Sequence, residues 1–89
     1  MAQITHRESV HTRIATLRDE AAAHGNEDMV AMCDRAEDYE LYGYDTAEPV
    51  TPDELGVSIT QYVEAICESL DEQSGTGAVD CGGHTVYAQ

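Results

Sequence analysis

Apolar residues recur at helical spacing in the first quarter of the chain. Residues separated by four, three and four positions share one stripe of a helix, and here they are Val10, Ile14, Leu17 and Ala21. Gly25 follows, a residue that accepts the left-handed conformation found at helix ends. The pattern predicts an amphipathic helix from about Ile4 to His24.

A second helix is predicted directly after the first. Asn26 is a favourable N-cap, and Glu27 and Asp28 follow it in the first turn, where the helix dipole favours acids. The broad apolar face of this helix consists of Met29, Val30, Met32, Cys33 and Ala36. We expect it to run to about Glu40. Because the connection at Gly25 is short, we expect it to lie antiparallel to the first helix.

Turn-forming residues interrupt the apolar pattern between residues 42 and 52 and predict a loop there. Two capping boxes follow, one beginning at Thr51 and one at Ser58, and either could start a third helix. If the helix starts at Ser58, residues 55–57 belong to a separate short turn. The stripe of the third helix is Ile59, Val63, Ile66 and Leu70. We expect the helix to end near Gln73.

The remaining residues combine a flexible break with a turn. Residues 74–77 contain only Ser, Gly and Thr, and Gly82-Gly83 separates two short runs that suit strands. This tail is either a short β-hairpin or a flexible segment, because an isolated hairpin is marginally stable in water. The predicted fold is mainly α. It is a small three-helix domain over residues 1–73, an antiparallel helical hairpin plus a third helix, followed by the tail or hairpin over 74–89.

The charge of the chain bears on function more than any motif does. The 89 residues include 18 acids and four arginines and no lysine, for a formal net charge of −14. The first 26 residues are balanced, so the whole excess lies from Glu27 onward. A field of this sign repels nucleic acid and anionic membranes, and it attracts basic surfaces. We therefore expect no direct binding to nucleic acid or to a membrane.

Size and motif content argue against catalysis and metal binding. A chain this short, without Phe or Trp, has a small core and little room for an enclosed cavity. No nucleophile elbow, phosphate-binding Gly-rich loop or HExxH motif is present. Cys81 and His84 are spaced like zinc ligands, but a structural zinc site needs four. Cys33 and Cys67 fall in apolar helical stripes, as core residues do. We expect no enzyme activity, no metal and no cofactor.

The cysteines also indicate a compartment. Three cysteines at wide spacing are not a disulfide framework, which favours a reducing cytoplasm. No stretch is long and apolar enough to span a bilayer, and no secretory signal is recognisable.

Residues 14–36 resemble a helical hairpin found in many small uncharacterised bacterial and phage proteins. The resemblance covers about a quarter of the chain and consists of an Ala-rich helix, a Gly-Asn turn at residues 25–26, and the segment Cys33-Asp34-Arg35-Ala36. It implies a helical hairpin and a bacterial or mobile-element origin, hence the cytoplasm of a bacterial host. No activity is attached to that group.

Acidic side chains at helical spacing form the first candidate binding surface. They are, on the second helix and the loop after it, Glu27, Asp34, Glu37, Asp38, Glu40 and Asp45, and on the third helix Glu64, Glu68 and Asp71 or Glu72. Acids of one helical stripe are about 4.5–6 Å apart along the axis, and phosphates of a DNA strand are about 3.4 Å apart. Two such stripes therefore imitate a phosphate backbone. The alternative is a solvated acidic face that serves solubility or salt adaptation.

Three tyrosines alternate with acids around the predicted end of the second helix: Tyr39, Tyr42 and Tyr44. Tyrosine is enriched at interface hot spots, and beside acids it suits an arginine-rich partner. Alternatively, one or two of the rings cover the small core, and we expect at least one to do so. Tyr42 and Tyr44 are the candidate partner contacts.

These patterns favour a small acidic binding protein. The leading hypothesis is a nucleic-acid mimic that blocks a basic, nucleic-acid-binding protein surface, as some acidic anti-CRISPR and anti-restriction proteins of phages do. That comparison rests on charge and size. The alternative is a general protein–protein interaction module or a homodimer that uses apolar helix faces.

Overall fold

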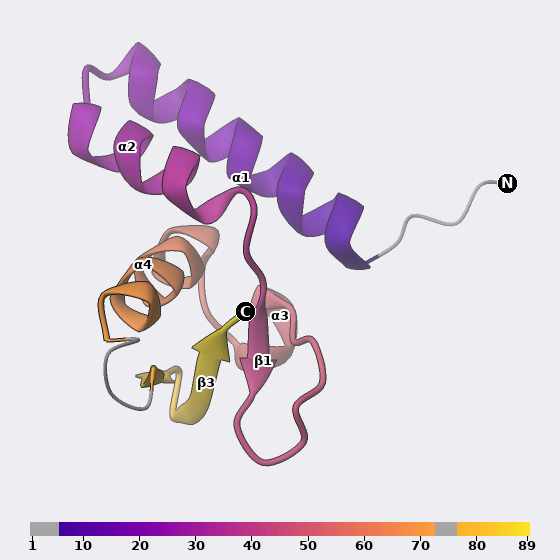
Figure 1. Ribbon diagram of the computed structural model, residues 1–89. Coiled ribbons are helices and arrows are strands. Elements are labelled where there is room, and N and C mark those ends of the chain that lie inside the picture. The colour runs from indigo at the N-terminus through magenta and orange to yellow at the C-terminus, as the bar shows by residue number, and fades with distance from the viewer. Residues whose placement is uncertain (1–5, 73–76) are drawn as a thin grey trace, which may run out of the picture.

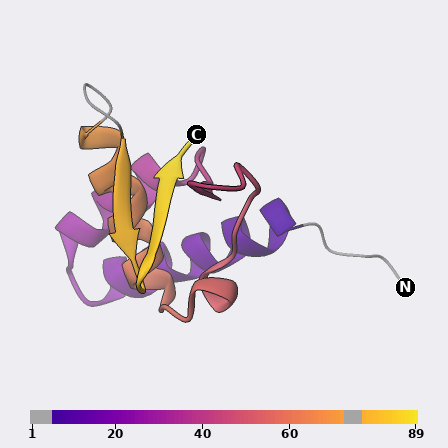
Figure 2. The same cartoon turned by 90° about the horizontal axis from the view of Figure 1, so that it is seen from below.

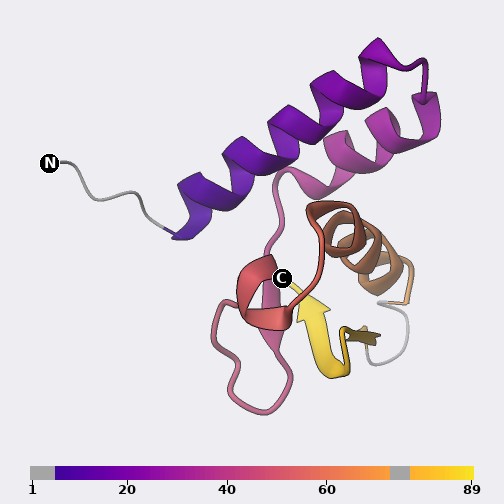
Figure 3. The same cartoon turned by 180° about the vertical axis from the view of Figure 1, so that it is seen from behind.

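The computed structural model describes residues 6–72 and 77–89. Within them the chain forms four helices and a three-stranded antiparallel sheet: α1 (His6–Ala23), α2 (Glu27–Ala36), β1 (Leu41–Gly43), α3 (Pro52–Leu55), α4 (Ile59–Asp71), β2 (Ala78–Cys81) and β3 (His84–Ala88). Figure 1 shows α1 and α2 as an antiparallel hairpin above α4, with the sheet and α3 below. The view from behind shows α3 in front of β1 (Figure 3).

The mainly α prediction is correct only in part. The helical hairpin and a long helix after the loop are present as expected, but part of the fold is a sheet. Its strand order is β1-β3-β2. The first strand lies where the sequence predicts a helix end and a loop. Because β3 pairs with β1, hydrogen bonds join the C-terminal hairpin to the rest of the chain.

The predicted helical hairpin turns at the expected residues. Gly25 has a φ of 71°, which a residue without Cβ adopts at little cost. The Asn26 side chain accepts a hydrogen bond from the Met29 N–H at 3.2 Å, as an N-cap does. The predicted start of the first helix, near Ile4, lies outside the described residues.

The second helix is shorter than predicted. It ends at Ala36 rather than near Glu40, and the chain then turns into β1. Leu41 is fully buried in that strand, and its N–H donates to the Tyr62 hydroxyl at 3.1 Å. A helix continued through Leu41 would use that N–H within the helix, so packing against Tyr62 favours the strand.

Both capping boxes of the sequence are formed. Thr51 and Glu54 cap the four-residue helix α3, which ends at Gly56 with a φ of 71°. Ser58 and Gln61 cap α4 in the same reciprocal way. The separate short turn before the long helix is therefore present. Helix α4 ends at Asp71, and the predicted end near Gln73 falls outside the described part of the chain.

The C-terminal residues form the β-hairpin alternative. Cys81 pairs with His84 across Gly82 and Gly83, whose φ values are 61° and 82°. Two positive φ values in a two-residue loop match the twist of the flanking strands. Ser69 of α4, fully buried, ties the hairpin to the helix by donating to the Gly77 carbonyl and accepting from the Ala88 N–H at 2.9 Å.

The core lies between the helices and one face of the sheet. It is formed by residues from every layer: Val10, Ile14, Cys33, Ala36, Leu41, Leu55, Tyr62, Val63, Ala65, Ile66, Cys67, Val79, Cys81, Val86 and Ala88. The apolar stripe predicted for the first helix is largely confirmed, since Val10, Ile14 and Ala21 are buried. Cys33 and Cys67 are core residues, as expected.

Candidate acidic binding surface

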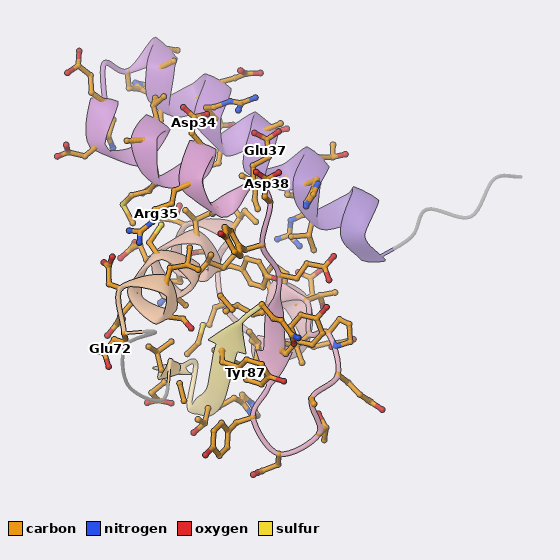
Figure 4. The ribbon with its side chains drawn as sticks, viewed as in Figure 1. Asp34, Arg35, Glu37, Asp38, Glu72 and Tyr87 are labelled. Carbon is orange, nitrogen blue, oxygen red and sulfur yellow. The ribbon has the colours of Figure 1, made fainter. Side chains whose placement is uncertain are left out.

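Two acids of the second helix share one arginine of the first. The Arg18 guanidinium lies 2.9 Å from Asp34 Oδ1 and 2.9 Å from Glu37 Oε2. The hydrogen bond to Asp34, and after it the one to Glu37, raises the pKa of Arg18. Figure 4 shows Asp34 and Glu37 where α1 and α2 meet. Part of the negative charge predicted for this face is therefore balanced within the protein.

A second arginine joins α2 to α4. Arg35 Nη2 lies 2.7 Å from Asp71 Oδ1, and this hydrogen bond raises the pKa of Arg35. Arg35 lies on the side of α2 that faces α4 (Figure 4). The acidic stripe predicted for the third helix ends at Asp71 or Glu72. Asp71 is in an ion pair. Glu72 is exposed at the end of α4.

One acid of the predicted surface is buried. Glu40 is 8% exposed, and its carbonyl accepts a hydrogen bond from the Gln89 N–H at 3.1 Å. The sequence places Glu40 in an exposed run of charge, but the chain enters the core at the next residue, Leu41. Asp38 and Asp45, on either side of it, are exposed. Glu40 therefore adds no area to the surface that a partner meets.

The third helical stripe forms one wall of a groove. Glu64 and Glu68 of α4 are exposed, and together with Asp80 of β2 they line a groove of about 180 Å³. The groove is lined by Val57, Gln61, Glu64, Ala65, Glu68, Asp80, Cys81 and Gly82. We call this surface the α4 acidic groove. Glu72, the C-cap of α4, is exposed but is not among the lining residues. Asp80 is a groove residue that the sequence reasoning missed, because nothing local indicates that β2 packs beside α4.

No arginine is among the residues that line this groove. Arg13 pairs with Asp53 at 3.1 Å, and Arg18 and Arg35 pair as above. Among the residues whose side chains the structure describes, no arginine forms an ion pair with Glu64, Glu68 or Asp80. Within the described part of the chain, the negative charge of the α4 acidic groove is therefore not balanced by an arginine.

The tyrosines divide between the core and the sheet. Tyr39 is half-buried and packs against the core, as we expect of at least one ring. Tyr42 stacks on Tyr87 of β3, with ring centroids 5.8 Å apart and planes at 28°. Tyr44 is 55% exposed. The sequence reasoning missed Tyr87. Alternation within residues 84–88 is a signal that could have placed its side chain on the other face of the strand from the buried Val86.

The cysteine and histidine of the last turn differ in burial. Cys81 is buried, and burial raises the pKa of its thiol. His84, paired with it across the turn, is exposed. Residues 6–72 and 77–89 contain no group of three or more His, Cys, Asp or Glu side chains placed to hold a metal ion.

Comparison of the chain with known protein families, with curated proteins and with solved structures finds no match. No helix within the described ranges is long and apolar enough to cross a membrane.

Proposed function

We propose that the protein is a small acidic binding protein that occupies a basic, nucleic-acid-binding surface of a partner protein and competes there with nucleic acid. One observation carries the proposal. Acids from α4 and β2 line a common groove, while each arginine with a described side chain is paired elsewhere. Unbalanced charge at one place attracts a complementary surface more strongly than evenly spread charge does.

The spacing of the acids along α4 and at its C-cap supports mimicry of a phosphate backbone. Glu64, Glu68 and Glu72 are exposed and recur every four residues, about 6 Å along the helix axis. Phosphates of one DNA strand are about 3.4 Å apart along the duplex axis, so the two charge densities agree within a factor of two. Like charges at this spacing destabilise a helix by about 0.2–0.5 kcal/mol per pair. Their retention on one face is consistent with a use.

Internal ion pairs shift the proposed contact toward α4. Asp34 and Glu37 share Arg18, and Asp71 is paired with Arg35. The α4 acidic groove is therefore the main contact, and the α2 acids contribute less. In its finer form the proposal is an inhibitor of the anti-CRISPR or anti-restriction type, acting in the cytoplasm of a bacterial host by steric and electrostatic competition. It assigns the protein no catalytic step.

The exposed surface offers less support for the alternative function. An interaction module or homodimer built on apolar helix faces needs large exposed apolar side chains. Among the described residues, Tyr44 is the large hydrophobic residue that is exposed, and it lies after β1 rather than on a helix.

The test begins with capture of partners from a bacterial lysate on the immobilised protein. Mimicry predicts that the captured proteins are basic and bind nucleic acid, and that added double-stranded DNA displaces them. Binding should also disappear at about 1 M salt, where the Debye length is about 3 Å. A partner that persists at that salt, or that DNA does not displace, would contradict the proposal.

Matched variants then locate the contact. Glu64→Gln with Glu68→Gln removes two charges from the groove, and Asp19→Asn with Glu20→Gln removes two exposed charges from α1. We expect the first pair to weaken binding about ten-fold, since each exposed charge contributes about 0.7 kcal/mol. The second pair should have a smaller effect. Equal effects would mean that total charge alone, as in a solubility role, accounts for the binding.

A further inference from the structure

The two faces of the sheet differ in what covers them. Side chains alternate between faces along a strand, and on one face Leu41, Val79 and Val86 are buried in the core. Figure 2, seen from below, shows β2 and β3 in front of the helices, with no element over them. The second face of the sheet is therefore open over these two strands. We call it the open sheet face.

Tyrosines occupy the centre of the open sheet face. The strand register places Tyr42 opposite Tyr87, and Tyr87 opposite Ala78, in one row across β1, β3 and β2. The rings of Tyr42 and Tyr87 are stacked, and both side chains are half-buried, so part of each ring meets solvent. Figure 4 shows Tyr87 of β3 close to β1. The row is an aromatic surface outside the hydrophobic core.

A third tyrosine extends the row. The Tyr44 N–H donates to the Thr85 carbonyl at 3.0 Å, which continues the β1–β3 pairing by one residue. By alternation, Tyr44 and Thr85 lie on the same face as Tyr42 and Tyr87. Thr85 is exposed, and Tyr44 is the large exposed hydrophobic residue described above. The open sheet face therefore presents three tyrosine rings from two adjacent strands.

The charges around these rings are negative. Asp80 is exposed on β2, the edge strand that also borders the α4 acidic groove, and by alternation it shares the face of Ala78. Asp45 and Glu48 are exposed in the loop after β1. The sequence contains no lysine or arginine after residue 35, so no such side chain of residues 36–89 can occupy these rings. Aromatic faces flanked by carboxylates complement a cationic side chain.

We propose that the open sheet face binds an arginine side chain of the basic partner, stacked on the Tyr42–Tyr87 pair and within reach of Asp80. This inference rests on the proposed function, because it names the side chain through which the partner is held. Arginine suits the face better than lysine for physical reasons. Its guanidinium is planar, weakly hydrated and able to stack on a ring while its N–H groups bind a carboxylate. A lysine ammonium is compact and strongly hydrated.

Nucleobases also stack on exposed tyrosines of a sheet. Here the net charge of −14 and the neighbouring acids repel the phosphates that accompany any base. Arginine is therefore the occupant that both the rings and the charges favour, and single-stranded DNA serves as the competing probe.

The test compares two peptides of equal length and charge, one alternating Gly and Arg and the other alternating Gly and Lys. We expect the Arg peptide to bind the full chain about two- to five-fold more tightly, the range that cation–π contacts at exposed sites give. Its addition should also shift the ring-proton NMR signals of Tyr42 and Tyr87. Equal affinity for the two peptides would overturn the arginine inference and leave the proposed function standing. Binding of neither would overturn both, and tighter binding of single-stranded DNA would assign the face to nucleic acid instead.

Variants separate the rings from the general charge. Tyr87→Leu should abolish the preference for Arg, whereas Tyr87→Phe, which keeps the ring, should retain it. The groove variant with Glu64→Gln and Glu68→Gln should weaken both peptides and leave their ratio unchanged. A folded Tyr87→Leu protein that still prefers the Arg peptide would overturn the inference. If Tyr87→Leu does not fold, the ratio of the two affinities and the ring shifts in the unaltered protein still decide it.

Discussion

The hydroxyl of Tyr62 accepts a hydrogen bond from the Leu41 backbone N–H at 3.1 Å, and so joins the N-terminal part of α4 to the start of β1. The same hydroxyl donates to the Val50 carbonyl at 3.2 Å. Tyr62 is fully buried, and it is the largest of the fully buried side chains. One side-chain oxygen thus forms hydrogen bonds with backbone groups of two segments outside the helices, at Leu41 and at Val50.

Tyr62→Phe should destabilise the protein more than the loss of a typical hydrogen bond does, which costs about 0.5–1.5 kcal/mol. The substitution keeps the ring but leaves the Leu41 N–H without its partner inside the core, which costs about 1–3 kcal/mol. Urea denaturation followed by circular dichroism measures the change. Tyr44→Phe is the control, since that hydroxyl is on an exposed side chain and its removal should change stability by less than about 0.5 kcal/mol. Equal effects of the two substitutions would show that the buried hydroxyl contributes nothing particular.

Stability should fall at alkaline pH because of the same side chain. Burial raises the pKa of Tyr62 from 10.0 to about 12. In the unfolded chain the phenol loses its proton near 10.0, whereas in the folded chain it keeps it until about 12. The free energy of unfolding is therefore unaffected by this phenol below pH 10. It falls as the pH rises from 10 toward 12, by about 2–3 kcal/mol in total.

Urea denaturation at a series of pH values measures this loss, and Tyr62→Phe should remove the part due to the phenol. Burial also raises the pKa of the Cys33, Cys67 and Cys81 thiols, so some loss should begin earlier, once pH exceeds the ordinary thiol value of 9.0, and persist in the variant. An identical pH profile for the variant and the parent protein would contradict the assignment to Tyr62.

Gly82 and Gly83 should respond differently to alanine, although they are adjacent in one turn. A Cβ on Gly82 would lie 2.6 Å from the Leu55 carbonyl oxygen and 2.7 Å from Val57 Cγ1, whereas one on Gly83 meets nothing within 4 Å. Both residues have positive φ, so each substitution carries a strain of about 1–2 kcal/mol. Gly82→Ala adds a clash with backbone that cannot move aside cheaply. Thermal melting should therefore show the larger loss for Gly82→Ala, and the opposite order would place the hairpin farther from α3 than described.

Arg18→Gln should strengthen binding to a basic probe. It releases Asp34 and Glu37 from the guanidinium they share at 2.9 Å. With the Gly-Lys peptide as the probe, we expect about two- to five-fold tighter binding at low salt, the range for one or two exposed charge pairs. Arg13→Gln is the matched control, because it removes the same charge beside Asp53 on α3. If the two variants bind the peptide equally, the α2 acids take no part in the contact.

Local signals in the sequence predicted much of the helical structure. The stripe through Val10 and Ile14, the N-cap at Asn26 and the capping boxes at Thr51 and Ser58 all act within a few residues of chain. Such features are set by helix geometry and by nearby backbone donors, so no distant contact is needed to recognise them. The resemblance of residues 14–36 to a bacterial and phage hairpin remains a hypothesis about origin.

The errors lie where a distant segment decides the outcome. Residues 39–43 read as a helix end and a loop, but Tyr62 and β3 convert part of this segment into a strand. Glu40 reads as a surface acid and is buried for the same reason. Asp34, Glu37 and Asp71 read as acids available to a partner, and the packing of α1 against α2 and of α2 against α4 brings arginines to them.

The sequence by itself determined the excess of negative charge and its absence from the first 26 residues, because charge is a property of composition and position alone. It also determined the helical hairpin and the caps, which depend on contacts between near neighbours in the chain. Only the tertiary structure decided which acids keep their charge unbalanced and which tyrosines share a face. Both depend on pairs such as Arg35 with Asp71 and Tyr42 with Tyr87, which are far apart in sequence and meet only when the layers pack.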